Sequence, residues 1–183
     1  MNQPQQHWYT INDIDQLDSP ALVIFPARVK QNIQFAISMT GDASRLRPHI
    51  KTHKTREAAE LMMAAGIDQF KCATIAEAEM LGQCKAPDVL LAYQPFGPKL
   101  QRFAALVKKY PDTKYSCLTD NIDAAAQIAK VFSDAGTTLP VFIDLNVGQN
   151  RTGIIPGKEA IALYEFCSKT KGISIIGLHA YDG

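Results

Sequence analysis

Short apolar runs alternate with longer amphipathic segments along nearly the whole chain, and this alternation constrains the fold more than any other feature. Six apolar runs from Leu46 onward are predicted to be strands: residues 46–51, 69–73, 88–92, 114–118, 140–145 and 173–178. The segments between them are predicted to be helices: residues 56–65, 74–83, 99–109, 121–135 and 158–169. An earlier strand, 21–25, and an earlier helix, 26–39, precede them. Strands separated by helices of this length indicate βαβ units and a parallel sheet, which is an α/β fold.

Residues that favour the beginnings and ends of helices support this assignment. Pro26 stands at the first position of its predicted helix, where its missing N–H costs nothing. Thr74 precedes a helix by one residue and Glu77 follows three positions later, which is the spacing of a capping box. Gly66 and Gly136 each follow a predicted helix, where glycine commonly ends one.

Composition excludes several classes of protein. The chain has 19 Lys and Arg residues against 18 Asp and Glu residues in 183, with no basic stripe, so it is not expected to bind nucleic acid. Its apolar runs are too short to cross a bilayer, and the first residues contain no apolar secretion core. The four cysteines show no Cys-x-x-Cys pair and no zinc spacing, so we expect reduced, mostly buried thiols and a cytoplasmic protein.

Six βα units fit two architectures, an open doubly wound sheet or the first part of an eight-stranded barrel. The chain contains neither the Gly-x-Gly-x-x-Gly fingerprint nor a Walker A loop, so the usual phosphate-binding argument for an open sheet is missing. Three candidate functional residues, Lys51, Arg151 and Tyr181, follow the ends of predicted strands. In a barrel such positions converge on one mouth, which favours the barrel.

Five segments in this order carry a resemblance to a known family: 18–23 (DSPALV), 47–54 (RPHIKTHK), 76–79 (AEAE), 148–153 (GQNRTG) and 177–183 (GLHAYDG). The chain resembles the fold-type III enzymes that use pyridoxal 5'-phosphate (PLP), whose N-terminal domain is a barrel of the alanine racemase type. Within that group it is most similar to the D-threonine aldolase and D-serine dehydratase family. The octapeptide 47–54 is the most specific of the five segments.

The resemblance implies roles for four residues. Lys51, the first lysine of KTHK, matches the catalytic lysine that forms a Schiff base with the cofactor. Arg151 matches the arginine that approaches the phenolic oxygen of PLP, and Tyr181 matches a position that flanks the pyridine ring. His179 would share a strand face with Tyr181 and contribute to the same site. His49, which precedes the turn, is expected to position its neighbours rather than bind a metal.

The activity implied is that of a lyase acting on D-3-hydroxy amino acids, either by aldol cleavage of the D-threonine type or by dehydration of the D-serine type. Two alternatives use the same barrel: an amino acid racemase and a PLP carrier protein without turnover. A catalytically silent half-barrel is a further possibility. The residues alone leave these alternatives open.

The resemblance also predicts how the chain is organised. Residues 1–44 would form a strand and helix leading into the barrel, and residues 45–183 would form a partial (β/α)8 TIM barrel with about six of its eight strands. A C-terminal β-domain, with the ligands for a divalent metal such as Zn or Mn, would lie outside this chain. We expect the full-length form to be a homodimer and residues 1–183 alone to be inactive.

Overall fold

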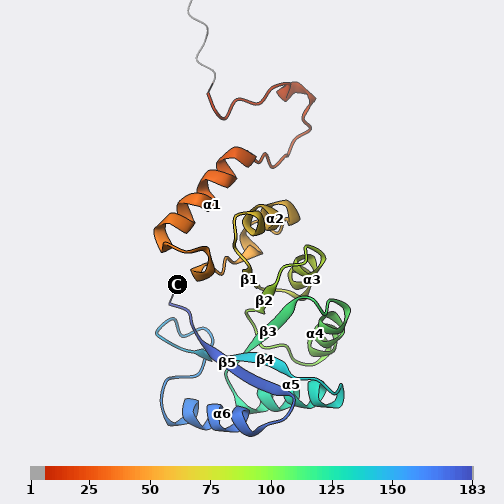
Figure 1. The fold of residues 1–183 in the computed structure, drawn as a ribbon, viewed down its shortest axis with the longest axis vertical. Coiled ribbons are helices and arrows are strands. Elements are labelled where there is room, and N and C mark those ends of the chain that lie inside the picture. Colours follow the sequence, from red (N-terminus) through yellow and green to blue (C-terminus); the bar gives the residue numbers. More distant parts are fainter. Residues whose placement is uncertain (1–6, 183) are drawn as a thin grey trace, which may run out of the picture.

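The computed structural model describes residues 7–182, which form a parallel sheet with helices along one side of it (Figure 1). The sheet has five strands in chain order, β1-β2-β3-β4-β5, and each neighbouring pair is parallel. The strands are β1 (Gln69–Cys72), β2 (Asp88–Leu91), β3 (Lys114–Thr119), β4 (Leu139–Leu145) and β5 (Ile173–Ala180). The parallel α/β arrangement predicted from the alternation is confirmed.

Helices α2 to α6 follow one another along the outer side of the curved sheet, while α1 extends away from it toward the N-terminal segment (Figure 1). The helices are α1 (Pro26–Thr40), α2 (Arg56–Ala64), α3 (Ile75–Gln83), α4 (Pro98–Lys109), α5 (Ile122–Asp134) and α6 (Lys158–Lys169). Three short 3-10 helices lie before β1: η1 (Ile14–Gln16), η2 (Ala43–Arg45) and η3 (Ile50–Thr52). This arrangement is a partial barrel of the predicted type.

The core lies between the sheet and its helices. Strand residues alternate between the two faces of a sheet, and in β1 the side chains of Phe70 and Cys72 are fully buried while Lys71 between them is only half-buried. Phe103 of α4 and Phe132 of α5 fill the layer between these helices and the strands. Four cysteines are free, three of them buried, as predicted. The other face of the sheet is therefore left to line the barrel interior.

Helix beginnings match the expected signals. Thr74 caps α3 by accepting the backbone N–H of Glu77 at 3.1 Å, and the Glu77 carboxylate accepts the backbone N–H of Ala73 at 2.8 Å. Asn121 caps α5 by accepting the N–H of Ala124 at 2.8 Å. These side chains satisfy donors that have no partner within their helices.

Two of the predicted strands are wrong. Residues 46–51 contribute one isolated bridge, between His49 and Lys71, and then turn into η3, so the count from Leu46 onward is five strands rather than six. Pro48 has no N–H to donate to a ladder, although its carbonyl accepts the N–H of Lys71 at 2.9 Å. Residues 21–25 form no strand and pair with none in the described part of the chain, and Leu22 is 86% exposed.

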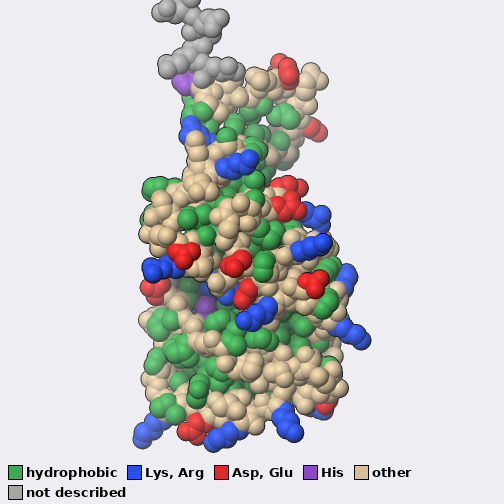
Figure 2. Space-filling view, in the orientation of Figure 1, with side chains coloured by type: hydrophobic (Ala, Val, Ile, Leu, Met, Phe, Trp, Pro, Cys, Tyr) green, Lys and Arg blue, Asp and Glu red, His purple; other side chains and the backbone are tan. Residues whose placement is uncertain are grey.

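The carboxyl ends of the five strands meet at one mouth, as barrel geometry requires. Figure 2 shows a recess near the middle of the molecule in which histidine and basic side chains gather.

Candidate active site

Lys51 lies where the chain turns from its bridge with β1 into η3. Ile50, directly before it, is fully buried and anchors the turn. The backbone N–H of Lys51 donates to Nδ1 of His49 at 3.3 Å, and the carbonyl of Ile50 accepts the N–H of Lys54 at 2.8 Å. Lys54 occupies the left-handed region, with φ at 52°. The turn thus separates the two lysines of KTHK, and only Lys51 lines the pocket described below.

The pKa of His49 is set by its position beneath this turn. Burial, together with the positive charges of Lys51 and Lys71, lowers the pKa of His49 from 6.5 to about 4, against an opposing effect of Glu77. Burial also lowers the pKa of His53. A neutral His49 keeps Nδ1 free to accept the N–H of Lys51 at neutral pH, in agreement with the positioning role predicted for it.

This depressed pKa predicts an acid-sensitive fold. Between about pH 6.5 and 4 the unfolded chain binds a proton at residue 49 that the folded chain does not, so stability is lost as pH falls through this window. Urea unfolding midpoints at pH 7, 5.5 and 4.5 should fall, and His49→Gln should reduce the fall. The exposed His7 provides the matched control, because His7→Gln should leave the slope unchanged. An unaltered slope in His49→Gln would contradict the prediction.

All four residues predicted from the resemblance, Lys51, Arg151, His179 and Tyr181, line a single pocket. The rest of its lining comes from the segment before η3, from the ends of β1, β2 and β3 and from the loop after β4: His49, Lys71, Ala92, Tyr93, Leu118 and Thr152. Residues separated by more than a hundred positions in sequence are therefore brought to one mouth of the partial barrel.

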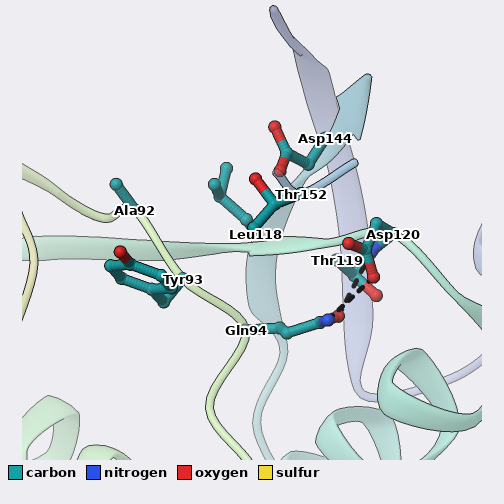
Figure 3. Close-up of a pocket in the computed structure, with 8 residues that line it drawn as sticks. All are labelled: Ala92, Tyr93, Gln94, Leu118, Thr119, Asp120, Asp144 and Thr152. Atoms are coloured by element: carbon teal, nitrogen blue, oxygen red, sulfur yellow. Dashed lines mark hydrogen bonds between the residues drawn. The ribbon is translucent and has the colours of Figure 1, made fainter. Parts of the chain in front are cut away.

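A second pocket adjoins the first and shares Ala92, Tyr93, Leu118 and Thr152 with it (Figure 3). Asp120 and Gln94 both line it, and the Gln94 amide donates to the Asp120 carboxylate at 2.7 Å, as the dashed lines in Figure 3 show. The same carboxylate accepts the backbone N–H of Gly153 at 3.0 Å. Asp120 therefore ties the end of β3 to the loop that carries Arg151.

Hydrogen bonds from its backbone N–H groups also hold the Arg151 loop, residues 148–153, in place. The side-chain oxygen of Asn146 accepts the N–H groups of Gly148 at 3.1 Å and Asn150 at 3.2 Å. Beyond the loop, the N–H of Ile154 returns to the carbonyl of Asp144 at 2.8 Å. These bonds close the loop over the end of β4 and leave the Arg151 guanidinium 5.2 Å from the centre of the Tyr181 ring.

His179 and Asp144 form a buried pair on neighbouring strands. They are register partners of β5 and β4, and Nδ1 of His179 donates to the Asp144 carboxylate at 2.5 Å. Asp144 is 4% exposed, and Nε2 of His179 is buried without a hydrogen-bond partner among residues 7–182. The carboxylate fixes the orientation of the imidazole ring, and an unsatisfied buried nitrogen beside a pocket is a group for a ligand to pair with.

Tyr181 lies between two cations. Its ring centre is 5.2 Å from the Arg151 guanidinium and 5.4 Å from the Lys71 ammonium. Sequence reasoning did not single out Lys71, although the pattern Gln-Phe-Lys-Cys in β1 was a usable signal. Alternation places Lys71 opposite Phe70 and Cys72, and hence on the interior face near the strand end.

No group of three or more His, Cys, Asp or Glu side chains in residues 7–182 could hold a metal ion. None of the helices in the described part of the chain is both long and apolar enough to cross a membrane.

Known proteins are similar to this chain in sequence over most of its length. D-threonine aldolase of Arthrobacter sp. is 28% identical over 172 residues, which cover 92% of this chain and 44% of that protein. D-threo-3-hydroxyaspartate dehydratase of Delftia sp. strain HT23 is 31% identical over 139 residues, or 75% of this chain and 36% of that protein. The chain thus spans less than half the length of these relatives.

Solved structures show the same correspondence. The crystal structure of D-threonine aldolase from Filomicrobium marinum matches with a TM-score of 0.83 and 30% identity, covering 91% of this chain and 45% of that one. An alanine racemase-like protein from Idiomarina loihiensis matches with a TM-score of 0.80 and 29% identity, covering 93% of this chain and 44% of that one. The model of the alanine racemase N-terminal domain matches residues 24–183. Because that match takes in the whole sheet and the pocket at its mouth, the chain belongs to the alanine racemase N-terminal domain family.

Proposed function

We propose that the protein carrying this chain is a PLP-dependent lyase that acts on D-3-hydroxy amino acids. The observation that carries the proposal is the convergence of Lys51, Arg151, His179 and Tyr181 on one pocket at the carboxyl ends of parallel strands. The relatives support it by their named activities, D-threonine aldolase, D-threo-3-hydroxyaspartate dehydratase and 3-hydroxy-D-aspartate aldolase.

The residues present fit PLP. An aldehyde cofactor needs an accessible amine, and Lys51 is exposed at the pocket. An aromatic pyridine ring needs a flat partner, which the Tyr181 ring provides. The cofactor's anionic oxygens need cations, and Arg151 lies beside that ring. The unpaired Nε2 of His179 adds a polar group that a ligand could satisfy.

Lys51 would hold the cofactor through its amine until the amine of the substrate takes its place. PLP supplies, when bound, an electron sink for negative charge that develops at the substrate Cα. The freed Lys51 amine could then take or return a proton at Cα, because it remains tethered beside that atom. The bond between His49 and the backbone N–H of Lys51 would keep the turn, and therefore this amine, in place.

The other residues would orient the cofactor and balance its negative charge. Tyr181 would pack against one face of the ring, and Arg151 would donate to the cofactor's phenolic oxygen. His179, whose tautomer Asp144 fixes, would present Nε2 toward the pocket. None of these roles requires movement of the sheet, since each side chain comes from a strand end or a loop tied to one.

Two reactions use this arrangement. In dehydration, Lys51 removes the Cα proton and hydroxide leaves Cβ. In aldol cleavage, a base removes the proton of the 3-hydroxyl, the Cα–Cβ bond breaks and Cα is protonated afterwards.

The full-length protein tests the proposal directly. With PLP and a divalent metal it should consume D-threonine or D-3-hydroxyaspartate and release glycine and an aldehyde, or ammonia and a keto acid. The L-enantiomers should not react. Interconversion of enantiomers without cleavage would support the racemase alternative, and bound PLP without turnover would support the carrier alternative. The homodimer, the cytoplasmic location and the division at residue 44 stay predictions.

Replacing Arg151 by alanine should weaken PLP binding. A hydrogen bond to a charged group contributes roughly 1.5–3 kcal/mol, which corresponds to roughly 10- to 100-fold in affinity. The dissociation constant, measured from the visible cofactor band, should rise by that factor, and the pH midpoint of the band should move upward because a cation has been removed. Arg102, exposed on α4, gives the matched control Arg102→Ala. Unchanged affinity in Arg151→Ala would place Arg151 outside the site.

A further inference from the structure

Lys71 is the one cation of the pocket to which neither the resemblance nor the proposed function gives a role. Its backbone is fixed on both sides: its N–H donates to the Pro48 carbonyl at 2.9 Å, and its strand pairs with β2. Its side chain lies on the interior face of the sheet and lines the same pocket as Lys51. The ammonium is 5.4 Å from the centre of the Tyr181 ring.

The charges around Lys71 are mostly of its own sign. Burial is the main cause that lowers the pKa of Lys71, and the positive charges of Lys51, Arg47 and Arg151 lower it as well. The one nearby anion that opposes this effect is Asp144, whose carboxylate is bonded to His179. Within residues 7–182 the structure gives the Lys71 ammonium neither a hydrogen bond nor an ion pair.

Such an arrangement is unfavourable in an empty site. A half-buried ammonium has lost part of its hydration, and three cations that face one pocket repel each other. The arrangement becomes favourable when anionic oxygens enter the pocket, because each cation then gains a charge-assisted partner. Arg47 does not share this need, since its guanidinium is bonded to the carboxylate of Asp88 and the side chain of Gln69.

Building on the proposed function, we infer that Lys71 is a second anion-binding residue of this site, which donates to an anionic oxygen of the bound ligands. Two oxygens share that chemistry: the phenolate of the cofactor and the carboxylate of the amino acid substrate. Lys71 and Arg151 lie at similar distances from the Tyr181 ring, so a flat ligand packed on that ring would present its oxygen-bearing edge to both cations.

The test uses Lys71→Met in the full-length protein, with Lys71→Arg as the conservative variant. Lys114, exposed at the first position of β3 and outside the pocket, supplies the matched control Lys114→Met. Two binding measurements are made: the PLP dissociation constant with the pH midpoint of the cofactor band, and the dissociation constant of D-alanine for the PLP-loaded protein. D-alanine carries the α-carboxylate but no 3-hydroxyl, so neither lyase reaction can follow.

If Lys71 holds the cofactor oxygen, Lys71→Met should raise the PLP dissociation constant about tenfold or more and move the pH midpoint upward. If it holds the substrate carboxylate, PLP binding should stay unchanged and D-alanine should bind about tenfold more weakly or worse. Lys71→Arg should recover most of either loss. Both outcomes support an anion-binding Lys71, and they distinguish its two possible ligands.

The inference is overturned if both constants for Lys71→Met stay within about twofold of wild type, or if Lys71→Arg fails to recover them while Lys114→Met is normal. Should Lys71→Met not fold, Lys71→Gln replaces it, and collapse of both would show that the ammonium stabilises the fold instead. Failure of the proposed function looks different: the wild-type protein would then take up no PLP at Lys51, and the inference would fail with it.

Discussion

Lys51→Ala is expected to abolish covalent attachment of PLP and to lower turnover by at least about 10²–10⁴-fold, the contribution of a positioned acid or base. Wild-type protein treated with borohydride should carry the reduced cofactor on the peptide that contains Lys51, and the variant should carry none. The fold should survive, since the Lys51 side chain is exposed and its turn is anchored by the buried Ile50. Mass spectrometry of the reduced protein makes the measurement without an activity assay.

Two other lysines serve as controls for this assignment. Lys54 belongs to the same motif, but the turn carries it away from the pocket, so Lys54→Ala should keep both the label and the visible band. Lys71 does line the pocket, so Lys71→Met should keep the label on Lys51 even where affinity falls. If borohydride reduction fixes the cofactor on Lys54 or Lys71 in wild-type protein, Lys51 is not the residue that forms the Schiff base.

The parallel α/β sheet could be predicted from the sequence because its signals are local. Thr74 and Asn121 cap helices through their own side chains, and a run such as Val141, Phe142 and Ile143 in β4 indicates a buried strand without knowledge of its partners. The alternation of such elements then limits the topology to a few arrangements. A strand, the helix after it and the next strand lie close together in sequence, and these three segments are enough to recognise each βαβ unit.

The two predicted strands that failed to form have no strand partner over their length among the described residues, and Pro48 was a local signal against the first of them. Residues 46–51 are apolar enough for a strand, but Pro48 interrupts the ladder and the backbone turns at Ile50 to bury that side chain completely. Residues 21–25 are an apolar run, yet such a run becomes a strand only where a neighbour accepts and donates hydrogen bonds. Among the described residues no such neighbour is present.

The site was predictable in part, for a related reason. The resemblance marked Lys51 and Arg151 through their motifs, but it could not indicate which side chains the interior of the sheet places beside them. Lys71 enters the pocket because strand alternation turns it inward, and the pairing of Asp144 with His179 depends on the register between β4 and β5. Register is a property of two strands together, so only the three-dimensional structure reveals the unpaired Nε2 of His179.

Gly153→Ala is the second substitution for which we expect a large effect, through the loop that carries Arg151. Gly153 has φ at +96°, and a Cβ there would stand 2.6 Å from the backbone nitrogen of Asn146 and 2.6 Å from the carbonyl carbon of Leu145. The backbone strain costs roughly 1–3 kcal/mol, and the clash adds an overpacking cost of roughly 1–3 kcal/mol. The loop must move, which weakens the bond from the Gly153 N–H to Asp120 and displaces Arg151.

Gly148 in the same loop provides the matched control. Its φ is +128°, but no atom of residues 7–182 lies within 4 Å of the position that a Cβ would take. Gly148→Ala therefore carries the backbone strain without the clash, and should lower stability less and leave PLP affinity closer to wild type. Urea unfolding gives the stability and the visible band gives the affinity. Equal losses in the two variants would mean that the tight packing at Gly153 has no particular role.

A double variant determines whether Gly153 acts on the cofactor through Arg151. Since the two residues belong to one loop, their effects on PLP binding should not add. Gly153→Ala combined with Arg151→Ala should bind PLP about as weakly as Arg151→Ala alone, while its stability should fall as far as that of Gly153→Ala. A double variant that binds PLP more weakly by the product of both factors would show that the loop supports a second contact to the cofactor. In that case the close packing at Gly153 would position another cofactor-binding group in addition to the guanidinium of Arg151.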